Sequence, residues 1–365
     1  MALASGFLFL SHNRFSYRCH PDEPGKVEQI QTGERNFHHP LLMLDATQAA
    51  FALSGMEAAP QKVVWMGRTV TAVFAILTVL AFSCAAYFTA GRLAALLCGA
   101  FLLATPLLIA VAHYFKEDPA MTMGLGLSFL AIALYQRTPS LGHLFLLAAG
   151  AALAASGKYL GAAILPFCLY TLFKQGGGLR HLAPFLGFTV GVYALLNFQA
   201  VAHFAGCLGA INQEVGLIKT GGGIASGHFS PWRGLGKYSA LFVENSAFPL
   251  FWFAGFGVWN WMRRRPAKTP FGQVALFTLL LFVTLAAVPK SAARYLLPVL
   301  CGFCFVAAVG AARLWKQGGW GWKTVGFALP LACALAIAIP RAHAVYRGFK
   351  DDSRLQMARW ITDHL

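Results

Sequence analysis

Residues 62–89 read KVVWMGRTVTAVFAILTVLAFSCAAYFT, in which the only charged side chains are those of Lys62 and Arg68. A helix needs roughly 20 mostly apolar residues to cross a bilayer, and a backbone in lipid must satisfy its hydrogen bonds internally. This stretch is therefore predicted to be a membrane-spanning helix. Nine further stretches are predicted spans on the same grounds: Leu93–Ala112, Pro119–Tyr135, Leu141–Ser156, Tyr159–Phe173, Leu182–Phe204, Ala247–Met262, Phe271–Val288, Tyr295–Ala312 and Thr324–Ile339.

The chain opens on another apolar stretch, Met1–Leu10, which is too short to span a bilayer alone at 1.5 Å per residue. It is either a clipped first helix or a re-entrant stub, because it lacks the basic region and cleavage site of a signal peptide. With this stretch, the predicted fold is an all-α polytopic membrane protein of about eleven helices. Two long segments, Ser11–Gln61 and Ala205–Ser246, lie between the spans.

The composition of the 365 residues agrees with a lipid environment, since 58% are hydrophobic and only 12% are charged. Soluble domains carry roughly 25% charged residues. The composition therefore excludes a disordered chain, a disulfide scaffold and an ordinary cytosolic enzyme. The net charge is +16. In a soluble protein this charge would suggest a nucleic-acid partner, but in a membrane protein the charges must first be assigned to the two sides of the membrane. No nucleic-acid partner is therefore predicted.

The loops between the spans assign the two sides of the membrane. With a cytosolic N-terminus, the cytosolic loops hold 11 Lys and Arg and no Asp or Glu, and all 13 carboxylates fall outside. The triplet Arg263-Arg264-Arg265 is a strong positive-inside signal. The outer side also carries 17 Lys and Arg, which either pair with carboxylates and lipid headgroups or hold an anionic ligand.

The first candidate site lies at residues 20–26, HPDEPGK, in the first outer segment. The adjacent carboxylates of Asp22 and Glu23 can serve as a general base and as a partner that adjusts its pKa or holds a cation. The structural alternative is a helix start, with Asp22 or Glu23 as N-cap and Pro24 at the first helical position.

A second candidate lies at residues 116–119, KEDP. Asp118 before Pro119 is also a typical helix start. However, Lys116, Glu117 and Asp118 are expected at the outer mouth of two buried helices, where ionisable side chains suggest function.

Two cations stand at junctions of apolar segments. Lys158 lies between two short spans and must snorkel, pair or meet a ligand. Arg294 precedes Tyr295 at the start of a span, and its planar guanidinium suits phosphate, although an Arg-Tyr pair is also typical of the interfacial aromatic belt. His39 and His228 are weaker candidates.

The order of these motifs resembles that of the GT-C membrane glycosyltransferases. The motifs are Asp22-Glu23, then His39-Pro40, then Lys116-Glu117-Asp118, then Gly157-Lys158-Tyr159, and finally RYLLP at 294–298. The resemblance is to the protein-mannosyltransferase-like branch and its bacterial relatives, which include the aminoarabinose and lipopolysaccharide-core transferases. It extends over nearly the whole chain.

The resemblance implies a polyprenyl-phosphate sugar donor, used from the periplasmic or luminal face of a membrane such as the bacterial inner membrane. It makes Asp22 the catalytic base of an inverting transfer, with Glu23 beside it. Lys116, Lys158 and Arg294 are expected to bind the donor phosphate. Glu117, Asp118, His39, Tyr295 and His228 are expected to orient the acceptor or hold a divalent cation, and metal dependence, the sugar and the acceptor stay open.

The competing hypothesis is a transporter or flippase for an anionic lipid-linked substrate. Such a protein needs ionisable residues near the bilayer midplane and internal symmetry, whereas the carboxylates here gather in outer segments. Residues 1–340 are predicted to form the catalytic membrane domain. Residues 341–365 are predicted to be an outer tail that resembles the start of a soluble domain.

Overall fold

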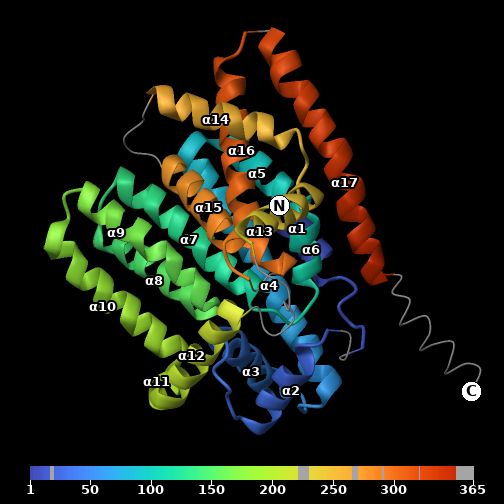
Figure 1. Cartoon of the computed structure of the whole chain (residues 1–365), viewed down its shortest axis with the longest axis vertical. Coiled ribbons are helices and arrows are strands. Elements are labelled where there is room, and N and C mark those ends of the chain that lie inside the picture. The colour runs from blue at the N-terminus through green and yellow to red at the C-terminus, as the bar shows by residue number, and fades with distance from the viewer. Residues whose placement is uncertain (17–19, 221–229, 265–269, 290–291, 320, 351–365) are drawn as a thin grey trace, which may run out of the picture.

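The computed structural model describes residues 1–16, 20–220, 230–264, 270–289, 292–319 and 321–350. Within these ranges the chain is helical and contains no strand (Figure 1). The α-helices are α1 (Ala2–Leu10), α2 (Glu23–Thr32), α3 (Leu42–Ser54), α4 (Pro60–Ala90), α5 (Arg92–Leu103), α6 (Pro106–Ala112), α7 (Asp118–Arg137), α8 (Leu141–Gly157), α9 (Leu165–Lys174), α10 (Gly178–Leu196), α11 (Phe198–Ala202), α12 (Phe204–Thr220), α13 (Pro231–Asn245), α14 (Leu250–Arg264), α15 (Phe271–Ala286), α16 (Leu297–Gln317) and α17 (Leu329–Lys350). The 3₁₀ helices η2 (Tyr159–Ile164) and η4 (Ala293–Leu296) precede α9 and α16, and the π-helix η5 (Trp322–Ala328) precedes α17.

The described helices include five that are long and apolar enough to cross a membrane, or up to seven if two bent pairs each count as one span. The five contain α4, α7, α10, α16 and α17. Three shorter apolar segments, Leu141–Gly157, Tyr159–Lys174 and Phe271–Ala286, lie among them. The predicted all-α, multi-pass membrane fold is therefore confirmed.

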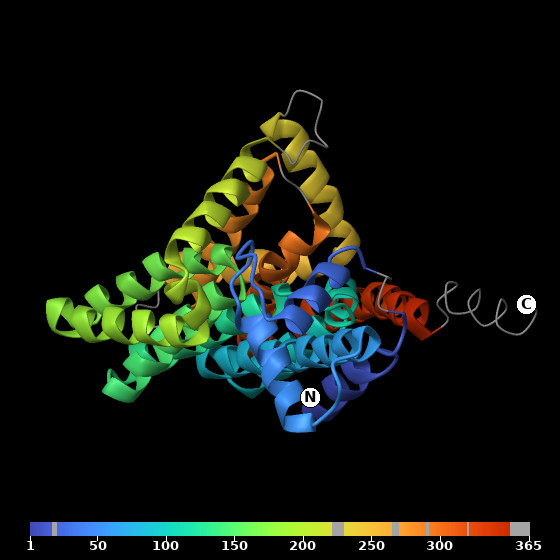
Figure 2. The same cartoon turned by 90° about the horizontal axis from the view of Figure 1, so that it is seen from below.

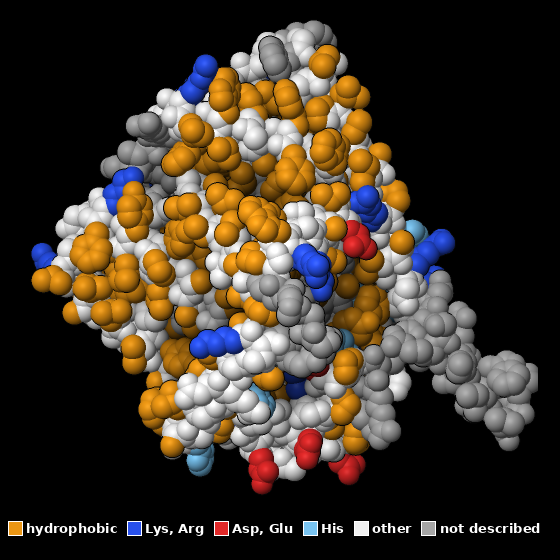
Figure 3. Space-filling model, in the orientation of Figure 1, with side chains coloured by type: hydrophobic (Ala, Val, Ile, Leu, Met, Phe, Trp, Pro, Cys, Tyr) orange, Lys and Arg blue, Asp and Glu red, His pale blue; other side chains and the backbone are white. Residues whose placement is uncertain are grey.

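The centre of the bundle is formed by α4, α7 and α16. In α16 and α7 the apolar windows are 94% and 83% buried, whereas those of α17 and α10 are 22% and 6% buried. The last two helices accordingly lie at opposite edges of the molecule (Figure 1). Hydrophobic side chains cover much of the surface between them (Figure 3), as expected of a surface that faces lipid.

Small residues let the helices at the centre approach closely. A Cβ atom on Gly124 of α7 would lie 2.2 Å from the backbone nitrogen of Ala154 in α8. A Cβ atom on Gly157 of α8 would lie 2.2 Å from the nitrogen of Met121 in α7. The two backbones are therefore in contact at both positions, as in other tightly packed membrane helices.

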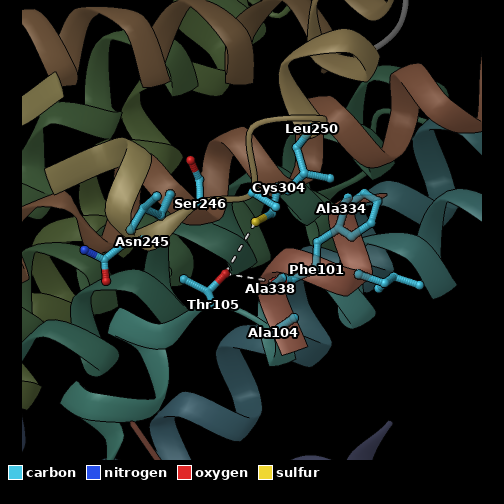
Figure 4. Close-up of a pocket in the computed structure, with 12 residues that line it drawn as sticks. Phe101, Ala104, Thr105, Asn245, Ser246, Leu250, Cys304, Ala334 and Ala338 are labelled. Carbon is cyan, nitrogen blue, oxygen red and sulfur yellow. Dashed lines mark hydrogen bonds between the residues drawn. The ribbon is translucent and has the colours of Figure 1, made fainter. Parts of the chain in front are cut away.

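Two helix breaks meet beside α16. The stretch Leu93–Ala112, predicted as one span, is divided into α5 and α6 with a bend of 65°, because Pro106 disfavours helix in the residue before it. A bend of 109° separates α13 from α14. Thr105 and Ser246 from these breaks lie near Cys304 and border a cavity of about 10 Å³, enough for about one water (Figure 4).

The two long segments between the predicted spans contain helices of their own. Ser11–Gln61 contains α2 and α3, and Ala205–Ser246 contains most of α12 and α13, which converge away from the bundle (Figure 2). The predicted span Leu182–Phe204 breaks at Asn197. The buried amide of Asn197 accepts from Leu41 N (2.8 Å) and donates to Ser156 Oγ (2.7 Å).

The predicted domain boundary after residue 340 falls inside α17. This helix continues through Pro340 to Lys350, and proline is tolerated there because neighbouring groups can satisfy the freed carbonyl. Residues 351–365, the rest of the predicted tail, lie outside the described residues.

We expect Gly124→Val to lower the unfolding temperature of the detergent-solubilised protein, with a loss of about 1–3 kcal/mol, because the side chain overlaps the α8 backbone. Gly187→Val in α10 is the matched control, since a Cβ atom there meets nothing within 4 Å. Equal unfolding temperatures for the two variants would contradict the close approach of α7 and α8.

Candidate active site

A buried ion pair joins α2 to α4. Arg68 of α4 donates from Nε to Glu23 Oε1 (2.9 Å) and from Nη2 to Glu23 Oε2 (2.6 Å), and both side chains are fully buried. The guanidinium also donates to the carbonyls of Asn13 (3.3 Å) and Ser16 (3.0 Å). Glu23 Oε1 accepts in addition from Phe115 N (3.2 Å). The sequence predicts a catalytic or cation-holding role for Glu23, and in the structure both of its carboxylate oxygens are paired with Arg68.

Asp22 occupies the N-cap position of α2, as the structural alternative predicts, but its side chain makes no capping hydrogen bond. Instead its Oδ2 contacts the ammonium of Lys116 and lies 3.7 Å from Arg294 Nη2. The Asp22 side chain is 37% exposed. The carboxylate is thus shared by two cations and is open to an incoming molecule.

The loop between α6 and α7 supplies Lys116 and Glu117. The Lys116 side chain is only 2% exposed, and burial together with the nearby charge of Arg294 lowers its pKa to about 7. Glu117 pairs with Lys26 (2.6 Å). Although burial alone would raise the pKa of Glu117, Lys26, His39 and Lys116 together hold it well below its usual range.

Asp118 and Lys158 form the next pair. Lys158 Nζ donates to Asp118 Oδ1 (2.8 Å) and lies 4.5 Å from the centre of the Tyr295 ring. Arg294 also faces this ring, at 5.4 Å. Asp118 is fully buried, and its Oδ2 has no hydrogen-bond partner among the described residues. This oxygen therefore lacks the hydrogen bond that a buried carboxylate oxygen usually has.

Two histidines stand beside these pairs. Burial and the charges of Lys116 and Arg294 lower the pKa of His20 to about 3, so its ring is neutral near pH 7. His20 Nδ1 accepts from Asp22 N (3.2 Å). Burial also lowers the pKa of His39, although Glu117 acts in the opposite direction.

The structure brings together every candidate from the sequence that it describes, and His228 lies outside the described residues. We call the ionic part of this region the charged cluster: Asp22, Glu23, Lys26, Arg68, Lys116, Glu117, Asp118, Lys158 and Arg294. It lies at the end of the bundle where α2 lies and α4 and α7 begin, and acidic side chains gather at that end (Figures 1 and 3).

Three side chains in this region were given no role from the sequence: Lys26, Arg68 and His20. Lys26 stands one helical turn after Asp22 in the quoted HPDEPGK motif, so the spacing alone places it on the same side of α2. Arg68 lies inside a predicted span, where a charged side chain requires a partner.

The charged cluster does not fit a divalent cation. Glu23, Glu117 and Asp118 are each paired with a Lys or Arg. Among the described residues, no three His, Cys, Asp or Glu side chains are arranged to hold a metal ion. We therefore assign no step to a metal.

No family model matches the sequence, and no curated protein matches it, but solved structures match its fold. ArnT from Cupriavidus metallidurans bound to undecaprenyl phosphate matches with a TM-score of 0.63 and 19% identity, over 98% of this chain and 71% of that one. An apo oligosaccharyltransferase from Archaeoglobus fulgidus matches with a TM-score of 0.60 and 13% identity, over 94% and 55%. AglB from the same archaeon, in complex with an inhibitory peptide and a dolichol-phosphate, matches with a TM-score of 0.57 and 11% identity, over 96% of this chain and 55% of that one.

These neighbours are GT-C transferases, and this chain has the GT-C fold, as the resemblance of its motifs predicted. The chain spans little more than half of the archaeal enzymes, at 55% of their length.

We expect Arg68→Met to destabilise the protein by about 3–5 kcal/mol, because it leaves the buried carboxylate of Glu23 without its cation. The double variant Arg68→Met/Glu23→Leu should recover part of the loss, and thermal unfolding in detergent measures both. If the double variant were no more stable than Arg68→Met, the uncompensated carboxylate would not be the cause.

Proposed function

We propose that the chain is an inverting glycosyltransferase that moves a sugar from a polyprenyl-phosphate donor to an acceptor. The observation that carries the proposal is the position of Asp22. Its exposed carboxylate contacts Lys116 and lies near Arg294, at one end of a helical bundle. A carboxylate that can act as a base and cations that can bind phosphate thus lie together, next to the apolar helices among which a lipid carrier would lie.

Lys116, Lys158 and Arg294 would bind the donor phosphate. Arg294 can engage two phosphate oxygens through its planar fork, and the two lysines supply point charges. In the structure described here Asp22 is the counter-ion of Lys116 and Arg294. An arriving phosphate would replace it, so donor binding would free the carboxylate to act as a base.

The donor's lipid has an apolar groove available. This groove has a volume of about 1,060 Å³ and is bordered by η2 and α9 on one side and by α15 on the other. It extends along α15 from Gly272 to Thr284, about 18 Å at 1.5 Å per residue. On the facing side it begins at Leu160, two residues after Lys158. An isoprenoid chain in the groove would lead its phosphate to the charged cluster.

In the reaction, an acceptor hydroxyl oxygen would attack the anomeric carbon as the bond from that carbon to the phosphate oxygen breaks. Asp22 would take the hydroxyl proton, and the electron pair of the broken bond would stay on the phosphate. Of the four carboxylates in the cluster, Glu23, Glu117 and Asp118 are at most 6% exposed, against 37% for Asp22. Asp22 is therefore the one that an acceptor can reach.

Cations already in place would favour the transition state over the bound donor. The leaving phosphodiester becomes a monoester and gains negative charge, so Lys116, Lys158 and Arg294 would interact with it more strongly as the bond breaks.

We place the reaction on the outer face, which is periplasmic if the membrane is a bacterial inner membrane. The support is the loop charge, since the opposite side holds 11 Lys and Arg and no carboxylate. The lipid carrier is supported by the neighbours, because one is bound to undecaprenyl phosphate and another to a dolichol-phosphate.

We expect Asp22→Asn to lower the release of polyprenyl phosphate by roughly 10²–10⁴-fold, because the amide cannot take the acceptor proton. The assay uses purified protein, a panel of polyprenyl-phosphate sugars and membrane extract as acceptor source. Folding should survive, since the Asp22 side chain does not cap α2.

Glu57→Gln is the matched control, because Glu57 is an exposed carboxylate on the same side of the membrane. Equal release by wild type and Asp22→Asn would remove Asp22 from the mechanism. Lipid binding without release from any donor would favour the transporter.

We expect kcat/KM for the donor to fall as the pH rises through about 7, because the Lys116 ammonium then loses its proton and its charge. Lys116→Arg keeps the positive charge, so the fall should move to higher pH in that variant. Rates from about pH 6 to about pH 9 test this, and identical profiles for both proteins would exclude Lys116 as the titrating group.

A further inference from the structure

A second hollow lies between the segment that follows α2 and the helices α11 and α12. It has a volume of about 660 Å³. One wall is the segment after α2, from Gly33 to Phe37, and the other is formed by residues 199–206 of α11 and the start of α12. We call it the α2–α11 pocket.

Two polar atoms in this pocket are buried without a hydrogen-bond partner among the described residues: Arg35 Nε and Gln199 Oε1. Arg35 is 2% exposed, and its other nitrogens are held by Asp45 Oδ1 (3.3 Å) and by Gln48 and Gln29. A fourth N–H donates to the carbonyl of Glu34 (3.5 Å), so the guanidinium is fixed and one of its five N–H groups is left over. The pocket offers one donor and one acceptor to a ligand.

Aromatic rings stand beside these polar atoms. The buried ring of Phe37 lies 6.3 Å from the His203 ring, centre to centre, and Phe204 is 67% exposed at the same wall. Phe37 also has a φ of +55°, a left-handed conformation that costs a residue with a side chain roughly 1–2 kcal/mol. Strain of this kind is concentrated at binding sites.

The pocket is tied to the charged cluster by short connections. The carbonyl of Phe37 accepts from the hydroxyl of Tyr159 (3.0 Å), and Tyr159 directly follows Lys158. Two residues after Phe37, His39 lies close enough to Glu117 and Lys158 for their charges to alter its pKa. A molecule in the pocket would therefore extend toward the proposed site of transfer.

The charge balance of the pocket favours a neutral ligand. Asp45 neutralises Arg35, and Glu34 adds a carboxylate to the lining, so no spare cation is available for an anion. A sugar fits the remaining features, because its hydroxyls both donate and accept and its C–H faces pack on aromatic rings.

We propose that the α2–α11 pocket binds a neutral saccharide portion of the acceptor. This inference rests on the proposed transferase function and extends it to the chemical class of the acceptor. Gln199 would bind a sugar hydroxyl and position the acceptor, while Asp22 performs the chemistry.

The test uses Gln199→Met, which keeps the length of the side chain and removes its amide. Saturation-transfer NMR on the full-length protein in detergent would measure binding of methyl glycosides, with neutral hexosides and N-acetylhexosaminides as probes. Gln213→Met is the matched control, because Gln213 is exposed on α12 and does not line the pocket. We expect glycoside affinity to fall about tenfold in Gln199→Met and to stay unchanged in Gln213→Met.

The same preparations separate this inference from the proposed function. With membrane extract as acceptor source, the KM for acceptor should also rise about tenfold in Gln199→Met. Donor cleavage without any glycoside binding, or with binding that survives Gln199→Met, would overturn the acceptor pocket alone. Failure of the wild type to cleave any donor would overturn the transferase function, and the acceptor assignment with it.

Discussion

The ion pair between Arg68 and Glu23 fixes the start of α2, and with it the position of Asp22 in the charged cluster. An arginine buried in a membrane helix is costly unless its charge is neutralised. Here both carboxylate oxygens of Glu23 pair with Arg68. Loop carbonyls accept further hydrogen bonds from its guanidinium. The pair fixes the first turn of α2 against α4. Because Asp22 immediately precedes Glu23, its carboxylate is held next to Lys116 by the same constraint.

Cations and carboxylates alternate through the charged cluster, but the pairs are not equivalent. Glu23, Glu117 and Asp118 are buried and have one close cation each, whereas Asp22 is exposed and borders two. The singly charged phosphodiester of the donor competes best where a carboxylate is both shared and accessible to solvent. In our account this difference couples donor binding to release of the base, so the carboxylate becomes free when a substrate is present.

The sequence predicted the membrane fold and most of the charged cluster. Charged side chains that flank apolar spans are confined to the ends of the helices, where they can pair with one another. Asp22, Lys116, Lys158 and Arg294 were found in this way. The pairing of Glu23 with Arg68 was not predicted, since Arg68 is 45 residues away and local spacing cannot reveal the pair. Apart from α2, which the helix start at Pro24 allowed, the helices in Ser11–Gln61 and Ala205–Ser246 were not predicted, because hydropathy detects spans and ignores polar helices stabilised by tertiary contacts.

The central claim is that the Asp22 carboxylate and the donor phosphate use the same cations. The most direct measurement is the affinity of purified wild type and Asp22→Asn for a polyprenyl phosphate without sugar, at constant salt. We expect tighter binding by Asp22→Asn, because the amide no longer competes for Lys116 and Arg294. Weaker or unchanged binding by Asp22→Asn would contradict it.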